Sequence, residues 1–290
     1  MRFAICPGAQ KAGTTTLHAL LATHPEICVP LKHKETRYFL DPLSELTLDA
    51  YSRLFPETPK GRVNFDADPE YLYFRGSAAK IADTLGAETK IIILLRNPVD
   101  RAYSQYWMSV RRGFETEDFE TAFRLEAERL REGGRHAHLH LGYFSRGFYS
   151  EQVEEYLDTF GRNNVRIVLF DELVSESVAT LQGLCHFLKI DDRWATRVTL
   201  PRANVGSLPR SRLLAKLHGQ PMAVKSVLKR LIPSRRIRWA FYPILERLNS
   251  AGARPPPMDD EFRRELVGYY AAEIDRLVDL LGVSLDHWRG

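Results

Sequence analysis

Residues 5–16 read Ile5-Cys6-Pro7-Gly8-Ala9-Gln10-Lys11-Ala12-Gly13-Thr14-Thr15-Thr16. A short apolar strand, a tight turn and a helix whose first N–H groups face an anion is the arrangement of a phosphate-binding loop. In a nucleotide-triphosphatase loop the lysine directly follows the second glycine. Here Lys11 comes two residues before Gly13, so its side chain would approach the phosphate from the loop. This shift favours a different phosphate-containing donor over ATP hydrolysis.

A second segment, residues 90–104, repeats the change from strand to helix. Residues 90–95 form a continuous apolar run, as expected of a central parallel strand, and Asn97-Pro98 is a good helix start. Arg96 would then lie at the carboxyl edge of the sheet, where open α/β sheets bind ligands. Together with Ser104, two helical turns further on, it could clamp a second phosphate. Taken alone, Arg96 could equally pair with a structural carboxylate.

The pattern along the chain predicts alternating strands and helices. Strands are expected at residues 2–6, 90–95 and 165–170, each followed by a helix, which favours βαβ units and a parallel sheet. Further helices are expected at residues 80–85, 149–160, 177–188, 224–231 and 259–281.

Two segments carry no such pattern. Residues 26–76 are rich in Pro, Asp and aromatic residues and are expected to be irregular, and residues 133–140 to form a loop. No internal repeat or domain boundary is visible. The sequence therefore predicts an α/β fold with a P-loop-type central parallel sheet flanked by helices, in a single domain over residues 1–290.

Composition is that of an ordinary globular enzyme, with 44% apolar and 27% charged residues among 290. The three cysteines are odd in number and scattered, which argues against a disulfide framework or a CxxC metal site and favours a reducing compartment. No secretory signal and no apolar run long enough to span a bilayer is visible. We expect a cytoplasmic protein.

The basic residues are unevenly distributed. Twelve Lys or Arg and no Asp or Glu occur between Arg193 and Leu245, although the net charge is only +4. This segment, residues 193–245, is either a solvated basic face or a surface facing an anion. The anion could be a phosphorylated cofactor, an acidic acceptor or a membrane surface contacted peripherally. Nothing indicates a nucleic-acid partner, and the oligomeric state is not predicted.

Together, the two strand–helix segments resemble a known family. Residues 8–17 resemble the 5′-phosphosulfate loop of sulfotransferases that use 3′-phosphoadenosine 5′-phosphosulfate (PAPS). Residues 95–104 resemble their 3′-phosphate motif, in the same order along the chain, and Phe170-Asp171-Glu172-Leu173 is similar to their strand followed by an acidic turn. The resemblance extends more weakly from Met1 to Trp288 and is strongest to the bacterial branch related to heparan-sulfate and other carbohydrate sulfotransferases.

The resemblance implies roles for individual residues. Lys11 would contact the bridging oxygen of the sulfate donor, while Arg96 and Ser104 would bind the 3′-phosphate that distinguishes PAPS from ATP. No metal would be required, because Lys11 and the helix terminus supply the positive charge that Mg²⁺ gives a kinase. The residues implied to hold the 5′-phosphate are Ala12, Gly13, Thr14, Thr15 and Thr16.

The resemblance also points to a general base. Carbohydrate sulfotransferases carry a glutamate just before an aromatic pair, and Glu35 precedes Tyr38-Phe39 in the same way. Its carboxylate would take a proton from the acceptor hydroxyl as sulfur is attacked in line. Without that context, a glutamate between lysines on a loop is simply exposed. His33 is the second candidate for the base and a candidate substrate contact.

The chain departs from the family at one position. Relatives usually carry a lysine where this chain has Ala67, flanked by Asp66 and Asp68. A second cationic contact to sulfate is therefore in doubt. Either aspartate could contact acceptor hydroxyls, or both could cap the following helix. The family's C-terminal loop over the nucleotide would fall on residues 202–207 and Arg210, without its usual Lys-Gly-Arg signature.

We therefore expect a sulfotransferase that moves a sulfuryl group from PAPS to a hydroxyl or amine of a carbohydrate, lipid or other small molecule. One alternative is a P-loop phosphotransferase that uses ATP or GTP. The displaced Lys11 and the absence of a clear Mg²⁺-binding strand end count against it, although Asp171 could imitate one. Another alternative is a noncatalytic nucleotide-binding or membrane-associated module, suggested by the basic segment.

Overall fold

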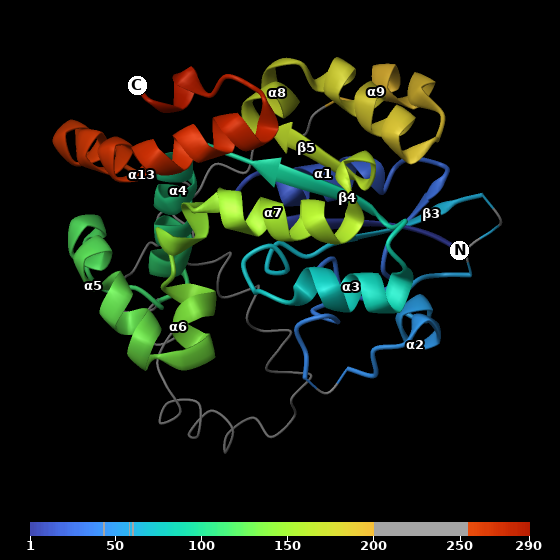
Figure 1. Ribbon diagram of the computed structural model, residues 1–290, viewed down its shortest axis with the longest axis horizontal. Coiled ribbons are helices and arrows are strands. Elements are labelled where there is room, and N and C mark those ends of the chain that lie inside the picture. The colour runs from blue at the N-terminus through green and yellow to red at the C-terminus, as the bar shows by residue number, and fades with distance from the viewer. Residues whose placement is uncertain (43, 58, 60, 200–254) are drawn as a thin grey trace. The chain divides into compact units, whose positions relative to one another are not determined.

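The computed structural model describes residues 1–290 except 43, 58, 60 and 200–254 (Figure 1). The helix expected at residues 224–231, the C-terminal loop at residues 202–207, Arg210 and most of the basic segment lie outside the described residues.

A five-stranded parallel sheet is the centre of the fold, in the order β2-β3-β1-β4-β5. Its strands are β1 (Arg2–Gly8), β2 (Ile27–Cys28), β3 (Val63–Ala67), β4 (Lys90–Leu95) and β5 (Val165–Leu169). Residues 91–95 of β4 are completely buried, because helices cover both faces of a parallel sheet. The predicted α/β fold with a central parallel sheet is confirmed, and so are the strands expected at residues 2–6, 90–95 and 165–170.

The expectation that residues 26–76 are irregular is wrong. They contain β2, β3 and a short helix, α2 (Leu48–Ser52). β3 pairs in parallel with β1, with Asp66 opposite Ile5. It reads Val-Asn-Phe-Asp-Ala, so two polar residues interrupt the apolar run that marks a central strand. Asn64 and Asp66 are nevertheless buried, at 1% and 0% exposure.

The chain divides into two compact units. The first comprises the described residues within 1–97, 148–203 and 271–288 and contains the whole sheet. In it α1 packs on β3, α7 on α3 and β4, and α9 on β5. Figure 1 shows α3 and α7 side by side in front of the strands. Its helices are α1 (Thr14–Leu21), α2, α3 (Ser77–Leu85), α7 (Tyr149–Phe160), α8 (Phe170–Ser175), α9 (Ser177–Leu188) and the second part of α13 (Asp260–Leu281).

The second unit comprises the described residues within 98–147, 204–270 and 289–290. It contains α4 (Pro98–Arg111), α5 (Phe119–Glu132), α6 (Gly134–His140) and the start of α13. The loop expected at residues 133–140 is wrong, because α6 is helical there: His136 and His140, one turn apart, both lie against Phe114. A single domain over residues 1–290 stays a prediction.

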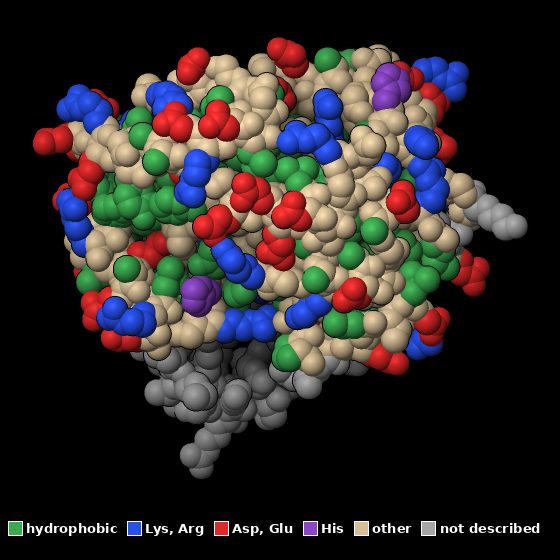
Figure 2. Space-filling view, viewed as in Figure 1, with side chains coloured by type: hydrophobic (Ala, Val, Ile, Leu, Met, Phe, Trp, Pro, Cys, Tyr) green, Lys and Arg blue, Asp and Glu red, His purple; other side chains and the backbone are tan. Residues whose placement is uncertain are grey.

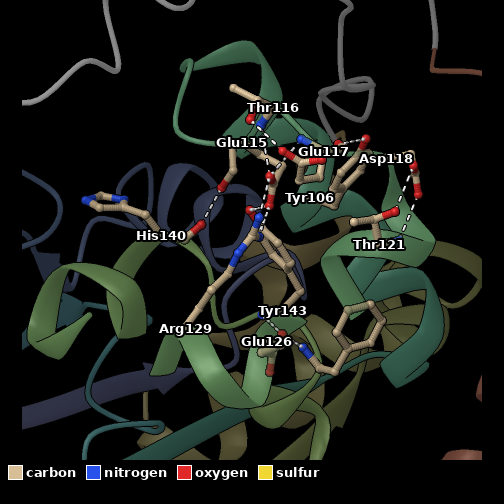
Figure 3. Close-up of polar contacts among 12 residues, drawn as sticks. Tyr106, Glu115, Thr116, Glu117, Asp118, Thr121, Glu126, Arg129, His140 and Tyr143 are labelled. Carbon is tan, nitrogen blue, oxygen red and sulfur yellow. Dashed lines mark hydrogen bonds and ion pairs between the residues drawn. The ribbon is translucent and has the colours of Figure 1, made fainter. Parts of the chain in front are cut away.

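Buried charges hold α5 in the second unit (Figure 3). Arg129 donates to the buried Glu115 at 2.7 Å, and the Tyr143 hydroxyl donates to the same carboxylate at 3.1 Å. Glu126 accepts the backbone N–H groups of residues 143, 144 and 145 at 2.6–2.7 Å. Burial raises the pKa of Glu126, and these three N–H groups oppose that rise. Buried carboxylates are tolerated here because each has donors.

Candidate functional site

The phosphate loop, residues 8–16, follows β1 at the carboxyl edge of the sheet. The Ala9 N–H donates to the Leu94 carbonyl at 2.6 Å, which ties the loop to β4. The Ala12 N–H donates to the Ala9 carbonyl at 3.1 Å, and Lys11 lies at φ +71°. Gly13, at φ +94°, precedes α1. The loop therefore leads directly into the first turn of α1, whose N–H groups have no partner within the helix, and this arrangement suits an anion site.

Two glycines of this loop have no room for a side chain. A Cβ at Gly8 would lie 2.7 Å from the Leu72 Cβ, and one at Gly13 would lie 2.9 Å from the Phe170 ring. Gly13 also has a positive φ that residues with a Cβ rarely adopt. The backbone at both glycines thus packs closely against neighbouring side chains.

Arg96 is part of the same site. Its Nη1 donates to the Lys11 carbonyl at 3.2 Å, and its guanidinium stacks 4.8 Å from the centroid of the Phe170 ring. The Tyr149 hydroxyl donates to the Arg96 carbonyl at 2.9 Å. Among the described residues Arg96 makes no ion pair with a carboxylate, so its charge is available to an anion beside the phosphate loop.

Ser104 lies on α4 and is half-buried, in the second unit. Its predicted action with Arg96 on one phosphate stays a prediction.

Glu35 lies on an exposed loop, residues 34–37, which we call the Glu35 loop. Its side chain is 41% exposed, with Lys34 Nζ 3.4 Å from Oε1 and Arg37 Nη2 3.6 Å from Oε2. Exposed ion pairs such as these contribute little to stability. His33, just before the loop, is also exposed. The carboxylate is thus accessible to an acceptor.

Lys34 points inward, which the sequence did not indicate. Its side chain is only 17% exposed. Burial and then the Lys34 charge lower the pKa of His18, on α1, to about 4. The same charge opposes the effect of burial, which raises the pKa of Cys6 to about 12 and that of Asp66 to about 7. The Lys34 ammonium therefore acts near the carboxyl ends of β1 and β3.

Asp66 and Asp68 lie beneath the Glu35 loop, and both are completely buried. Asp66 Oδ2 accepts from the Thr36 hydroxyl at 2.8 Å and from the Tyr51 hydroxyl at 2.9 Å. Asp68 accepts the N–H groups of Arg37 at 2.8 Å and Glu70 at 3.2 Å. Burial and the charge of Glu35 raise the pKa of Asp68 to about 6. The bond from the Glu70 N–H to Asp68 caps a turn and not a helix, because α3 begins only at Ser77. Substrate binding by either aspartate stays a prediction.

Some contacts of the site were not predicted. Gln10 donates to the buried Glu70 at 2.7 Å, and the Leu72 N–H donates to the Pro7 carbonyl at 2.8 Å, which joins the phosphate loop to the segment after β3. No pattern in the sequence marks these partners. Phe170 had a signal, because it is the last residue of the strand expected at residues 165–170, but its proximity to Gly13 and Arg96 comes from the fold.

The residues present suit an anion with more than one phosphate. Backbone N–H groups, Lys11 and Arg96 supply donors and positive charge at one edge of the sheet. Within the described part of the chain, no group of three or more His, Cys, Asp or Glu side chains could hold a metal ion.

Comparisons with known proteins agree with this geometry. Residues 4–200 match the family model of the sulfotransferase domain. The chain is 28% identical over 186 residues to mouse heparan sulfate glucosamine 3-O-sulfotransferase 3B1, covering 64% of this chain and 45% of that protein. It is 26% identical over 294 residues to mouse bifunctional heparan sulfate N-deacetylase/N-sulfotransferase 4, covering 97% of this chain and 30% of that protein. The chain thus spans less than half the length of these two curated relatives.

A solved structure matches the whole chain. The crystal structure of a sulfotransferase from Alicyclobacillus acidocaldarius is 26% identical, with a TM-score of 0.72, and the match covers 100% of this chain and 99% of that one. The family resemblance inferred from residues 8–17 and 95–104 is confirmed. This chain belongs to the sulfotransferase domain family.

Proposed function

We propose that this protein transfers a sulfuryl group from PAPS to a hydroxyl or amine of a carbohydrate, lipid or other small molecule. One observation carries the proposal: Arg96 donates to the carbonyl of Lys11, 85 residues earlier. This bond brings the residue proposed for the 3′-phosphate against the loop proposed for the 5′-phosphate. PAPS carries phosphates at both positions.

The phosphate loop binds the donor in this proposal. The N–H groups of α1 and the residues from Ala12 to Thr16 hold the 5′-phosphate, and Arg96 and Ser104 hold the 3′-phosphate. Lys11 lies beside the oxygen that bridges phosphorus and sulfur. Its ammonium stabilises the negative charge that develops there.

Glu35 serves the acceptor. The acceptor oxygen or nitrogen forms a bond to sulfur while the bond from sulfur to the bridging oxygen breaks, and its electron pair stays on the phosphate. Glu35 takes the proton of the acceptor. The residues proposed to contact the acceptor are His33, Asp66 and Asp68. The acceptor class is found by screening with labelled PAPS.

Cofactor choice tests the donor assignment. We expect 3′-phosphoadenosine 5′-phosphate to bind more tightly than ATP in calorimetric titrations, because Arg96 meets a phosphate that ATP lacks. Arg96→Ala should reduce this preference, whereas Arg62→Ala, at an exposed arginine just before β3, should leave it unchanged. Tighter binding of ATP would instead favour a phosphotransferase.

Glu35→Gln tests the base. We expect kcat to fall by about 10²–10⁴-fold, while binding of 3′-phosphoadenosine 5′-phosphate and the melting temperature stay unchanged. Glu120→Gln is the matched control, because Glu120 is also exposed and pairs with an arginine, Arg124, at 3.2 Å. Unchanged sulfate transfer by Glu35→Gln would remove Glu35 as the base.

We also propose a cytoplasmic location, supported by three cysteines that are all free and buried. In the described part of the chain, no helix is both long and apolar enough to cross a membrane. Peripheral membrane contact through residues 193–245 remains part of the proposal. Arg193 itself forms an ion pair with Asp191 at 2.7 Å. On the face drawn in Figure 2, basic and acidic side chains of the described residues are interspersed.

A further inference from the structure

The carboxyl end of β3 carries two buried acids. Asp66 lies within the strand, and Asp68 directly follows its last residue, Ala67. Each is completely buried, and no arginine or lysine forms an ion pair with either among the described residues. Buried carboxylates are costly unless donors surround them, so their donors indicate their role.

Those donors come from the Glu35 loop. The Thr36 hydroxyl donates to Asp66 at 2.8 Å, and the Arg37 N–H donates to Asp68 at 2.8 Å. The two residues that directly follow Glu35 are therefore each bonded to a different aspartate. Arg37 also lies at φ +56°, which is uncommon for a residue with a side chain and persists only where surrounding contacts hold it.

The aspartates are themselves held by the fold. The Tyr51 hydroxyl donates to Asp66 at 2.9 Å, the Tyr71 hydroxyl lies 2.7 Å from the Thr36 hydroxyl, and the Glu70 N–H donates to Asp68 at 3.2 Å. Asp66 pairs through β3 with Ile5 of β1, the strand that leads into the phosphate loop. One rigid sheet thus connects the anchors of the Glu35 loop to the phosphate loop.

We propose that Asp66 and Asp68 are positioning residues, which hold the backbone after Glu35 so that its carboxylate meets the acceptor in a fixed orientation. The inference rests on the proposed role of Glu35 as the base. The ion pairs of Glu35 with Lys34 and Arg37 contribute little to this, because they are 3.4 and 3.6 Å long and the Glu35 side chain is 41% exposed. Orientation of a reacting group is itself a large part of catalysis, and the buried anchors supply it.

The first test changes Thr36, the residue of the Glu35 loop that is bonded to Asp66. Thr36→Val keeps the shape of the side chain and removes the hydroxyl that donates a hydrogen bond to Asp66. We expect kcat to fall about tenfold, with unchanged binding of 3′-phosphoadenosine 5′-phosphate, and Thr36→Ser to restore kcat. Thr159→Val is the control, because among the described residues the Thr159 hydroxyl is bonded to the carbonyl of Glu155 in its own helix, and kcat should not change.

The aspartates are tested by conservative change. Asp66→Asn keeps an oxygen for Thr36 and Tyr51 and should retain most of the activity. Asp68→Asn keeps an acceptor for only one of its two N–H donors and should lose about as much kcat as Thr36→Val. Melting temperatures identify variants that fail to fold. If an aspartate variant fails to fold, the comparison of Thr36→Val with Thr36→Ser decides whether the positioning role holds.

A double-mutant cycle separates the two proposals. If Thr36 acts through Glu35, Thr36→Val should lower kcat no further in a Glu35→Gln background. An equal tenfold loss in both backgrounds, or no loss in Thr36→Val alone, would overturn the positioning role and leave Glu35 as the base. If Glu35→Gln alone transfers sulfate normally, the base assignment fails and the positioning role fails with it.

Discussion

The phosphate loop and the Glu35 loop meet the carboxyl edge of the same sheet but are held by different groups. Backbone contacts hold most of the phosphate loop: the Ala9 N–H to Leu94, the turn at Ala12 and a glycine at φ +94°. Side chains hold the Glu35 loop, and they belong to a strand 30 residues further along the chain. A loop shaped largely by the backbone geometry of consecutive residues leaves a contiguous signature in the sequence, whereas the distant side chains that hold the other loop leave no local signal.

Among the substitutions that test this comparison, Lys11→Ala should reduce the activity most. We expect kcat to fall about 10²–10³-fold, because in the proposed mechanism the ammonium neutralises charge on the leaving oxygen. Steady-state kinetics with labelled PAPS measures the loss. Lys80→Ala, at an exposed lysine on α3, should have no effect. A loss no greater than that of Thr36→Val would mean that the phosphate loop works mainly through its backbone.

Gly13→Ala tests the backbone contribution itself. Gly13 and Gly76 both precede a helix at positive φ, +94° and +81°. An added Cβ would lie 2.9 Å from the Phe170 ring and 3.6 Å from Leu94 at Gly13, and would meet nothing within 4 Å at Gly76. Gly76→Ala should therefore cost only the backbone strain, about 1–2 kcal/mol of unfolding free energy. Gly13→Ala should cost more and also weaken binding of 3′-phosphoadenosine 5′-phosphate. Equal losses in urea unfolding would show that Phe170 moves aside.

The pH dependence of the unfolding free energy tests Asp66, the buried residue that is bonded to the Glu35 loop. We expect it to be the smallest of these effects. The pKa of Asp66 is raised to about 7, chiefly by burial and then by the charge of Asp68. Between its ordinary value of 3.8 and about 7, the folded state binds a proton that the unfolded state has lost, so Asp66 destabilises the fold as pH rises. The slope is at most about 1.4 kcal/mol per pH unit.

Asp66→Asn removes this titration. Unfolding free energies at pH 5 and pH 6 should show the wild type losing stability relative to the variant over that interval. Asp68 and His18 also titrate at acid pH, and comparison with the variant cancels their contribution to first order. A difference between the two proteins that does not change with pH would mean that Asp66 is ionised throughout.

Much of the fold was predictable because its signals are local. β4 and the helices α7 and α9 have the bounds expected from apolar runs, spacing and the residues at their ends. β3 was missed because its Asn64 and Asp66 look like loop residues. The donors that make Asp66 acceptable in a central strand, Thr36 and Tyr51, come from segments that no local pattern connects to it.

The sequence by itself determined the phosphate loop, the strand that leads into Arg96 and, through them, the family. These features depend on consecutive residues, whose backbone geometry and order carry the chemistry. Only the tertiary structure decided that Lys34 points inward, that Phe170 packs between Gly13 and Arg96, and that Asp66 and Asp68 hold the Glu35 loop. A parallel sheet brings the carboxyl ends of distant strands to one edge, and which side chains meet there depends on strand order and register.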